Sequence, residues 1–331
     1  MRTKLLALVV LFVLVVVGRA RADAVFLLEE PYGHLGSWNP TGHAAVYLTN
    51  VCADTPTHLR ACHEGEAGVV ISRYRSLDGY DWIAIPIVPY LYAVESLQEI
   101  PGSVDAAQVA ELRDAYRRNH LLAIAPSDFE GRAPKGEWYE LIGSAYDRTI
   151  YGFRISSSAD QDAAFIAEYN ARRNRRHYSL FADNCADFAR HVLNFYAPHA
   201  VHRNILADAG ITTPKQVARS LVKYAKRHPE VSFTTFEIRQ VPGEIHRSRP
   251  VDGVLEAVLK TKRYLLPLAV LHPVVTVGLA ATYLTEGRFD PRRNAVMLDV
   301  ATALQSPPPD ADTPAPVAGF AAMSSDSEQR R

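Results

Sequence analysis

Cys185 stands where a cysteine can act as a nucleophile. It follows Asn184, a residue type that is favoured at helix N-caps. The apolar spacing of a helix continues after it at Phe188, Val192 and Phe195. A thiol in the first turn of a helix lies beside unpaired backbone N–H groups and the positive end of the helix dipole, which stabilise a thiolate and can hold an oxyanion. The competing interpretation is a buried, inert cysteine, because free cysteine is among the most buried residue types.

A cysteine nucleophile needs a base, and among the 12 histidines His43 has the best context. Turn-forming residues 40–42 come before it, and the apolar run 44–48, which predicts a strand, begins directly after it. A histidine at this point stands at the mouth of a sheet, rigidly held and accessible. A structural histidine is the alternative. Tyr178, upstream of the cysteine, either donates to an oxyanion or belongs to the core.

The two motifs, taken in their order along the chain, resemble a known family. Residues 41–48 read TGHAAVYL, and residues 184–189 read NCADFA. A histidine that opens a strand and precedes a cysteine at the head of a helix resembles the circularly permuted NlpC/P60 branch of papain-like thiol enzymes. This branch includes the lecithin–retinol acyltransferase-like proteins. The resemblance implies a permuted papain-like α+β core, with Cys185 as the nucleophile and His43 as its base.

The resemblance covers only these two short motifs and their order. The family places a third polar residue near the start of the strand that follows the histidine strand. His63, Glu64 and Glu66 all precede the apolar run 68–71, and the sequence does not choose among them. Permuted members include amide hydrolases, ester hydrolases and acyltransferases, so the resemblance does not name the substrate.

The elements that must position these residues are mixed. Strands mostly precede helices instead of alternating with them, which favours an α+β fold with an antiparallel sheet packed on helices. A capping-box pattern, Ser158 with Gln161, predicts the start of one helix. Strands are expected at 44–48, 68–74, 82–86 and 231–241, and helices at 104–120, 158–172, 183 onward and 214–228.

The N-terminus has the layout of a secretory signal peptide over residues 1–22. Basic Arg2 and Lys4 come first, the apolar run 5–17 follows, and residues 20–22 fit an A-x-A cleavage site. An uncleaved N-terminal anchor is the alternative. Export predicts a protein of the periplasm or of the outer face of the inner membrane, with its cysteines in an oxidising compartment.

Two further cysteines are expected to form a disulfide. Cys52 and Cys62 lie ten positions apart between two predicted strands, and such neighbours pair in an exported chain. Closing this loop would stabilise the fold by about 2–3 kcal/mol in the chain-entropy model. The pairing leaves Cys185 as the odd cysteine. The sequence has no CxxC or HExxH motif and no glycine-rich phosphate loop, so it predicts neither a metal nor a cofactor.

The C-terminal part differs in composition from the rest of the chain. Residues 264–284 contain no Asp, Glu, Lys or Arg and are long enough to cross a bilayer. They predict a transmembrane segment within a hydrophobic region at 246–304, with a buried helical hairpin bent at the prolines as the alternative. The proline- and serine-rich residues 305–331 predict a disordered tail. The thiol enzyme domain is therefore expected over 23–245.

Charge and composition exclude some classes of protein. The 331 residues include 36 basic and 36 acidic side chains, and this balance argues against a protein that coats nucleic acid. Four of the basic residues and no acidic one lie in the predicted signal, which leaves 32 basic against 36 acidic residues. The arginine run at 172–176 is either a solvated helix end or a surface for an anionic substrate.

These features together predict an exported, membrane-associated thiol hydrolase or acyltransferase. Its substrates would be amide or ester bonds of cell-envelope peptides or lipids, cleaved through an acyl-thioester on Cys185. One competing hypothesis is a non-catalytic envelope protein that uses the same fold for binding or scaffolding. Another is a membrane protein in which Cys185 is merely buried.

Overall fold

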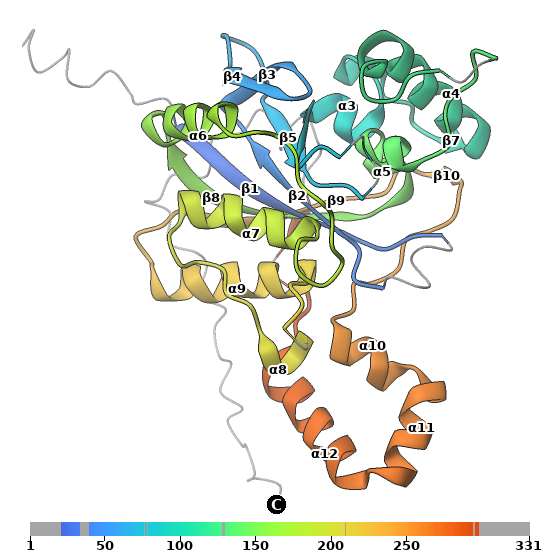
Figure 1. The fold of residues 1–331 in the computed structure, drawn as a ribbon, viewed down its shortest axis with the longest axis vertical. Helices are drawn as coiled ribbons and strands as arrows, with labels where there is room; N and C mark the ends of the chain where they lie inside the picture. The colour runs from blue at the N-terminus through green and yellow to red at the C-terminus, as the bar shows by residue number, and fades with distance from the viewer. Residues whose placement is uncertain are drawn as a thin grey trace, which may run out of the picture.

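A seven-stranded, mostly antiparallel sheet forms the centre of the protein (Figure 1). The computed structural model describes residues 21–33, 40–75, 77, 79–127, 130–208, 210–293 and 295–297. The strand order is β11-β9-β8-β1-β2-β5-β6, and only β9 and β11 pair in parallel. The strands are β1 (Arg21–Glu29), β2 (His43–Leu48), β5 (Val69–Ser72), β6 (Ile83–Pro86), β8 (Ile150–Ser158), β9 (Phe233–Ile238) and β11 (Val296–Met297).

Helices cover both faces of this sheet, so the central strands are buried on both sides. In β2, Ala45 and Tyr47 face one core, while Ala44 and Val46 face the other. This two-sided burial explains why β2 reads as a continuous apolar run and not as an alternating one. The first core is covered by α3 (Ile87–Tyr92), α4 (Ala106–Tyr116) and α5 (Ser144–Asp147), and the second by α6 (Ala159–Ala171), α7 (Cys185–Tyr196) and α9 (Pro214–Arg227).

Smaller elements complete the described chain. A two-stranded hairpin of β3 and β4 packs over the second core, and β7 pairs with β10. Their bounds are β3 (Val51–Thr55), β4 (His58–Ala61), β7 (Val104–Asp105) and β10 (Gly243–Glu244). The remaining helices and turns are η1 (Leu97–Glu99), η2 (Arg117–Leu121), η3 (Glu137–Leu141), α8 (Ile205–Asp208), α10 (Val254–Lys260), α11 (Lys262–Leu271), α12 (Pro273–Thr282) and η4 (Tyr283–Gly287).

The predicted α+β class is confirmed, and most predicted elements are present. The capping box forms as expected, since the Ser158 hydroxyl accepts from the Gln161 amide at 3.2 Å and the Gln161 side chain accepts from the Ser158 amide at 3.1 Å. The strand predicted at 82–86 is β6, which ends the sheet. Among the strands that were not predicted are β1 and β8, which pair with each other along nine positions at the middle of the sheet.

The predicted disulfide is present in the structure. Cys52 on β3 is bonded to Cys62, which directly follows β4. The bridge therefore closes the β3–β4 hairpin at its base. Cys185 is the free cysteine of the chain, as the count of three cysteines requires.

The predicted single membrane span at 264–284 is not present as one helix. The chain forms two ten-residue helices instead, α11 and α12, and reverses direction at His272. Pro273 is the first residue of α12, where the missing amide hydrogen costs least, and it ends the helix before it. Within the part of the chain that the structure describes, no helix is long and apolar enough to cross a membrane. The alternative expected a buried helical hairpin. The hairpin that forms is not buried, because α12 has no buried residue.

Other predicted boundaries meet the structure only in part. The signal peptide at 1–22 lies outside the described residues except for its last two positions, which begin β1. The tail at 305–331 lies wholly outside them. Residue 245 is no break in packing, since Ser248 donates to Glu30 at 2.6 Å and Val251 is buried in the second core.

Candidate active site

The first turn of α7 holds the candidate nucleophile where the sequence placed it. Cys185 is the first residue of the helix, and the Asn184 side chain caps it by accepting from the Asp187 amide at 2.9 Å. The Asn184 amide group also donates to the carbonyls of Leu180 and Thr212, at 2.9 and 3.0 Å. These three contacts fix the backbone that carries the thiol, because they engage both ends of the capping side chain.

His43 opens β2, as predicted, and the turn before it depends on a glycine. Gly42 has a positive φ of 72°, and a Cβ atom there would lie 2.0 Å from the carbonyl oxygen of Glu29. Only glycine allows this approach of the turn to β1. The backbone of His43 then pairs with Glu29 in the sheet register, and its side chain is buried.

The structure brings His43 and Cys185 to the same end of β2 without joining them by a hydrogen bond; both residues are described. The Ser72 hydroxyl lies 2.8 Å from His43 Nε2 and 2.8 Å from the carbonyl oxygen of Ala44. The backbone amide of Ala44 acts on the Cys185 sulfur. A short chain of contacts through Ser72 and Ala44 thus connects the imidazole with the thiol.

The Ser72 hydroxyl bears on which histidine nitrogen is the base. It has one proton and lies within reach of two acceptors, the carbonyl oxygen of Ala44 and Nε2 of His43. When that proton goes to the Ala44 carbonyl, His43 donates from Nε2, and Nδ1 is the nitrogen that can take a proton. The Tyr74 ring stacks on the imidazole with 4.9 Å between ring centroids, which holds its plane.

Burial sets the charge state of both groups. It raises the pKa of the Cys185 thiol to about 11, although the amides of Ala44 and Ala186 and the charge of Arg148 favour the thiolate. Burial, assisted by Arg148, lowers the pKa of His43 well below its usual value. At neutral pH the resting site therefore holds a neutral thiol and a neutral imidazole, which suits general-base activation and not a preformed ion pair.

A buried ionic cluster lies beneath the histidine and was not predicted. The Arg148 guanidinium donates to Glu29 at 3.2 Å and to Glu140 at 3.0 Å, and Ser144 donates to Glu29 at 2.6 Å. Tyr90 also donates to Glu29. The positive charge of Arg148 acts on both Cys185 and His43. No local sequence signal marked it, because its partners come from three separate parts of the chain.

The three candidates for the third polar residue lie away from His43. Glu66 accepts from Arg60 at 2.6 and 2.7 Å and from the His63 amide at 2.6 Å, and Glu64 is exposed beside them. They precede β5 at the end that faces Leu48, five residues along β2 from His43, or roughly 16 Å at strand spacing. Ser72, at the opposite end of β5, is the residue of this strand that contacts the His43 imidazole.

Two neighbouring features bear on the approach to the thiol. Tyr178 is half-buried, and burial together with the nearby Cys185 raises its pKa, so its hydroxyl stays protonated and can donate. The arginine run is partly engaged in structural contacts. Arg176 pairs with Asp183 at 2.5 Å, just before α7, and Arg175 stacks over the Tyr80 ring at 4.2 Å.

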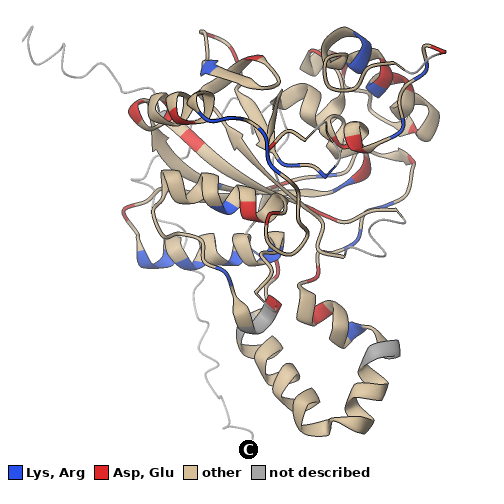
Figure 2. Cartoon of the chain, viewed as in Figure 1, with Lys and Arg blue, Asp and Glu red and all other residues tan. Residues whose placement is uncertain are grey.

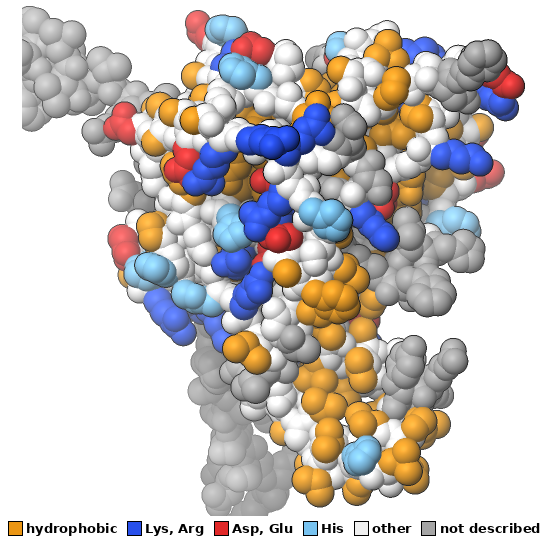
Figure 3. Space-filling model, viewed as in Figure 1, with side chains coloured by type: hydrophobic (Ala, Val, Ile, Leu, Met, Phe, Trp, Pro, Cys, Tyr) orange, Lys and Arg blue, Asp and Glu red, His pale blue; other side chains and the backbone are white. Residues whose placement is uncertain are grey.

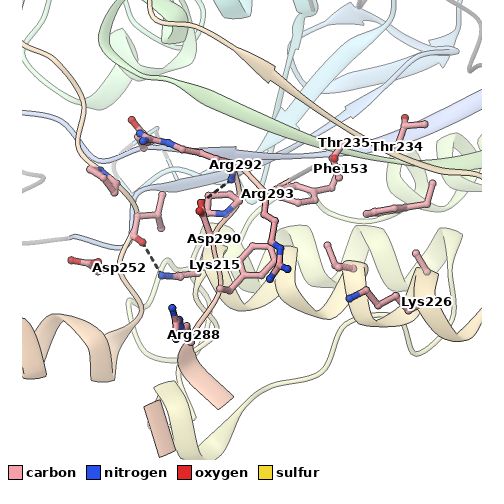
Figure 4. A pocket seen from close by; sticks show the side chains of 18 of the residues that line it. Phe153, Lys215, Lys226, Thr234, Thr235, Asp252, Arg288, Asp290, Arg292 and Arg293 are labelled. Carbon is pink, nitrogen blue, oxygen red and sulfur yellow. Dashed lines mark hydrogen bonds and ion pairs between the residues drawn. The ribbon is translucent and has the colours of Figure 1, made fainter. Parts of the chain in front are cut away.

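A large cavity lies apart from this site. It has a volume of about 1880 Å³ and lies between α9, the β8–β9 end of the sheet and residues 288–293, as Figure 4 shows. Neither Cys185 nor His43 lines it. A cavity of about 730 Å³ on the α4 side reaches Tyr32, whose ring lies under the Arg148 guanidinium at 4.7 Å.

Comparison with known proteins gives no match. No family model, no curated protein and no solved structure is similar to this chain.

Proposed function

We propose that this protein is an exported thiol-dependent hydrolase or acyltransferase that acts on amide or ester bonds of cell-envelope peptides or lipids. The observation that carries the proposal is the position of the Cys185 sulfur. It lies at the N-terminus of α7, at the amides of Ala186 and of Ala44, the residue that follows the candidate base His43 in the chain. The permuted NlpC/P60-like core belongs to this proposal, supported by a histidine at the head of a central strand and a cysteine at the head of the helix that packs on it.

The proposed reaction follows the chemistry of these groups. Nδ1 of His43 accepts the thiol proton after the imidazole turns toward Cys185, while Ser72 accepts from Nε2 in the resting state. The sulfur attacks the carbonyl carbon, and the amides of Ala44 and Ala186 donate to the oxyanion. The intermediate then expels the amine or alcohol, which takes the proton from His43. The acyl-thioester passes its acyl group to water or to another acceptor.

The second candidate function is a non-catalytic envelope protein with the same core. The raised thiol pKa and the absence of a hydrogen bond between the described side chains of His43 and Cys185 favour this alternative. A reactive cysteine protease-like site usually holds its thiol at a lowered pKa. The two functions differ in whether Cys185 becomes acylated.

Acylation by an activated ester separates them. The full chain is incubated with p-nitrophenyl butyrate, and peptide mass mapping locates any butyryl group, with hydroxylamine treatment to identify a thioester. Acyl transfer predicts a hydroxylamine-sensitive butyryl group on Cys185 and no such group in Cys185→Ser. In His43→Gln the rate of acylation should be lower than that of the parent by roughly 100-fold or more. His191→Gln, an exposed histidine on the same helix, is the matched control and should behave as the parent protein. No adduct on Cys185 would favour the binding protein.

A further inference from the structure

Exposed apolar side chains gather on the α11–α12 hairpin, since seven of the 13 exposed large hydrophobic residues of the described chain lie within residues 266–284. Figure 1 shows the hairpin projecting from the sheet and its covering helices, and Figure 3 shows hydrophobic side chains over its surface. Val270 is 78% exposed and Val274 is 84% exposed, on either side of the reversal. The other strongly exposed apolar side chains of the hairpin are Leu266, Leu271, Val275 and Val277, and Leu284 follows in η4.

The distribution of these side chains points to a lipid phase and not to a protein groove. A helix that docks on a protein presents one apolar stripe, with polar residues on its other face. Here apolar residues are exposed on both helices and on both sides of the reversal, and residues 264–285 contain no Asp, Glu, Lys or Arg. Figure 2 shows this uncharged stretch projecting below the basic helix α9. A helix that is apolar all round is typical of a membrane environment.

The dimensions of the hairpin limit how deep it can reach. Each helix has ten residues and is therefore about 15 Å long, which is half of the roughly 30 Å hydrocarbon core of a bilayer. Because the chain reverses at His272, both ends of the hairpin remain on the same side. Such a segment can enter one leaflet while the central sheet and its covering helices stay in water.

Positive charge lies at the base of the hairpin, where lipid headgroups would be. Arg288 and Arg293 follow the hairpin and are exposed, and Lys226 is exposed on α9 at the same cavity (Figure 4). Basic side chains at this level are attracted to anionic lipids. We propose that the α11–α12 hairpin inserts into one leaflet of an anionic bilayer and holds the protein at the membrane surface.

Vesicle flotation tests this proposal independently of the thiol chemistry. The full chain is mixed with phosphatidylcholine vesicles, with or without phosphatidylglycerol, and the bound fraction is measured. Val274→Glu should bind roughly tenfold or more weakly, because one exposed apolar side chain is replaced by a charge. Leu122→Glu is the matched control, since it adds the same charge at an apolar residue that is 48% exposed outside the hairpin, and it should bind as the parent does. Arg288→Gln should lose several-fold affinity for anionic vesicles only.

Two results would overturn the proposal. Equal flotation of the parent and Val274→Glu would show that the hairpin does not contact lipid. A parent protein that does not float but forms a dimer in sedimentation velocity, with the dimer lost in Val274→Glu, would assign the surface to a second copy of the chain.

Discussion

The titration of Cys185 tests the electrostatic account of the candidate site most directly. The pKa of about 11 lies two units above the ordinary value of 9.0, so at neutral pH the thiolate fraction should be about 100-fold lower than that of an ordinary thiol. This difference corresponds to about 3 kcal/mol against the charged form. Burial causes it, and the two backbone amides and Arg148 only partly offset it. Because only the thiolate reacts with iodoacetamide, alkylation of the folded protein should be slow at pH 7.

The assay is the rate of iodoacetamide alkylation of Cys185, followed by mass spectrometry between pH 6 and pH 11. We expect the rate to rise about tenfold per pH unit up to the folded-state pKa. The shape of the profile is independent of how easily the reagent enters, and Cys185→Ser gives the background. A rate that levels off below pH 8 would reveal a preformed thiolate–imidazolium pair and refute this reasoning.

Two further predictions concern stability. Replacing both Cys52 and Cys62 by alanine should lower the free energy of unfolding by about 2–3 kcal/mol, since the bridge closes a loop of ten positions; urea denaturation checks this, and an unchanged midpoint would contradict it. The lowered pKa of buried His43 means that the unfolded chain binds more protons below pH 6.5, so stability is present above that pH and is lost as the pH falls. The loss should approach, at most, about 1.4 kcal/mol per pH unit, and His43→Gln should lack it. Urea unfolding at pH 7.5 and 5.5 gives the free energies of unfolding. An equal loss in the parent and in His43→Gln would argue against a buried neutral imidazole.

The parts of the fold that were predicted correctly depend on local sequence. A capping box, an N-cap before Cys185 and a disulfide between two neighbouring cysteines all involve residues within ten positions of each other. The unpredicted strands β1 and β8 are buried over most of their length at the centre of the sheet, so they lack the alternation that marks a strand with one exposed face. β1 also begins within the segment that was predicted to be a signal peptide.

The candidate site likewise has features that local sequence predicted and features that depend on contacts between distant segments. The residue types and their local positions were sufficient to single out Cys185 and His43, because a helix start and a strand start are legible in a few residues. Only the tertiary structure placed Ser72 on His43 and brought Arg148 next to Glu29, since those pairs are 29 and 119 positions apart in the chain. It likewise decided that residues 264–284 form an exposed hairpin and not one helix, because exposure depends on what the rest of the chain leaves uncovered. The sequence by itself thus determined which groups could do chemistry, while the packing of distant segments decided their protonation and their partners.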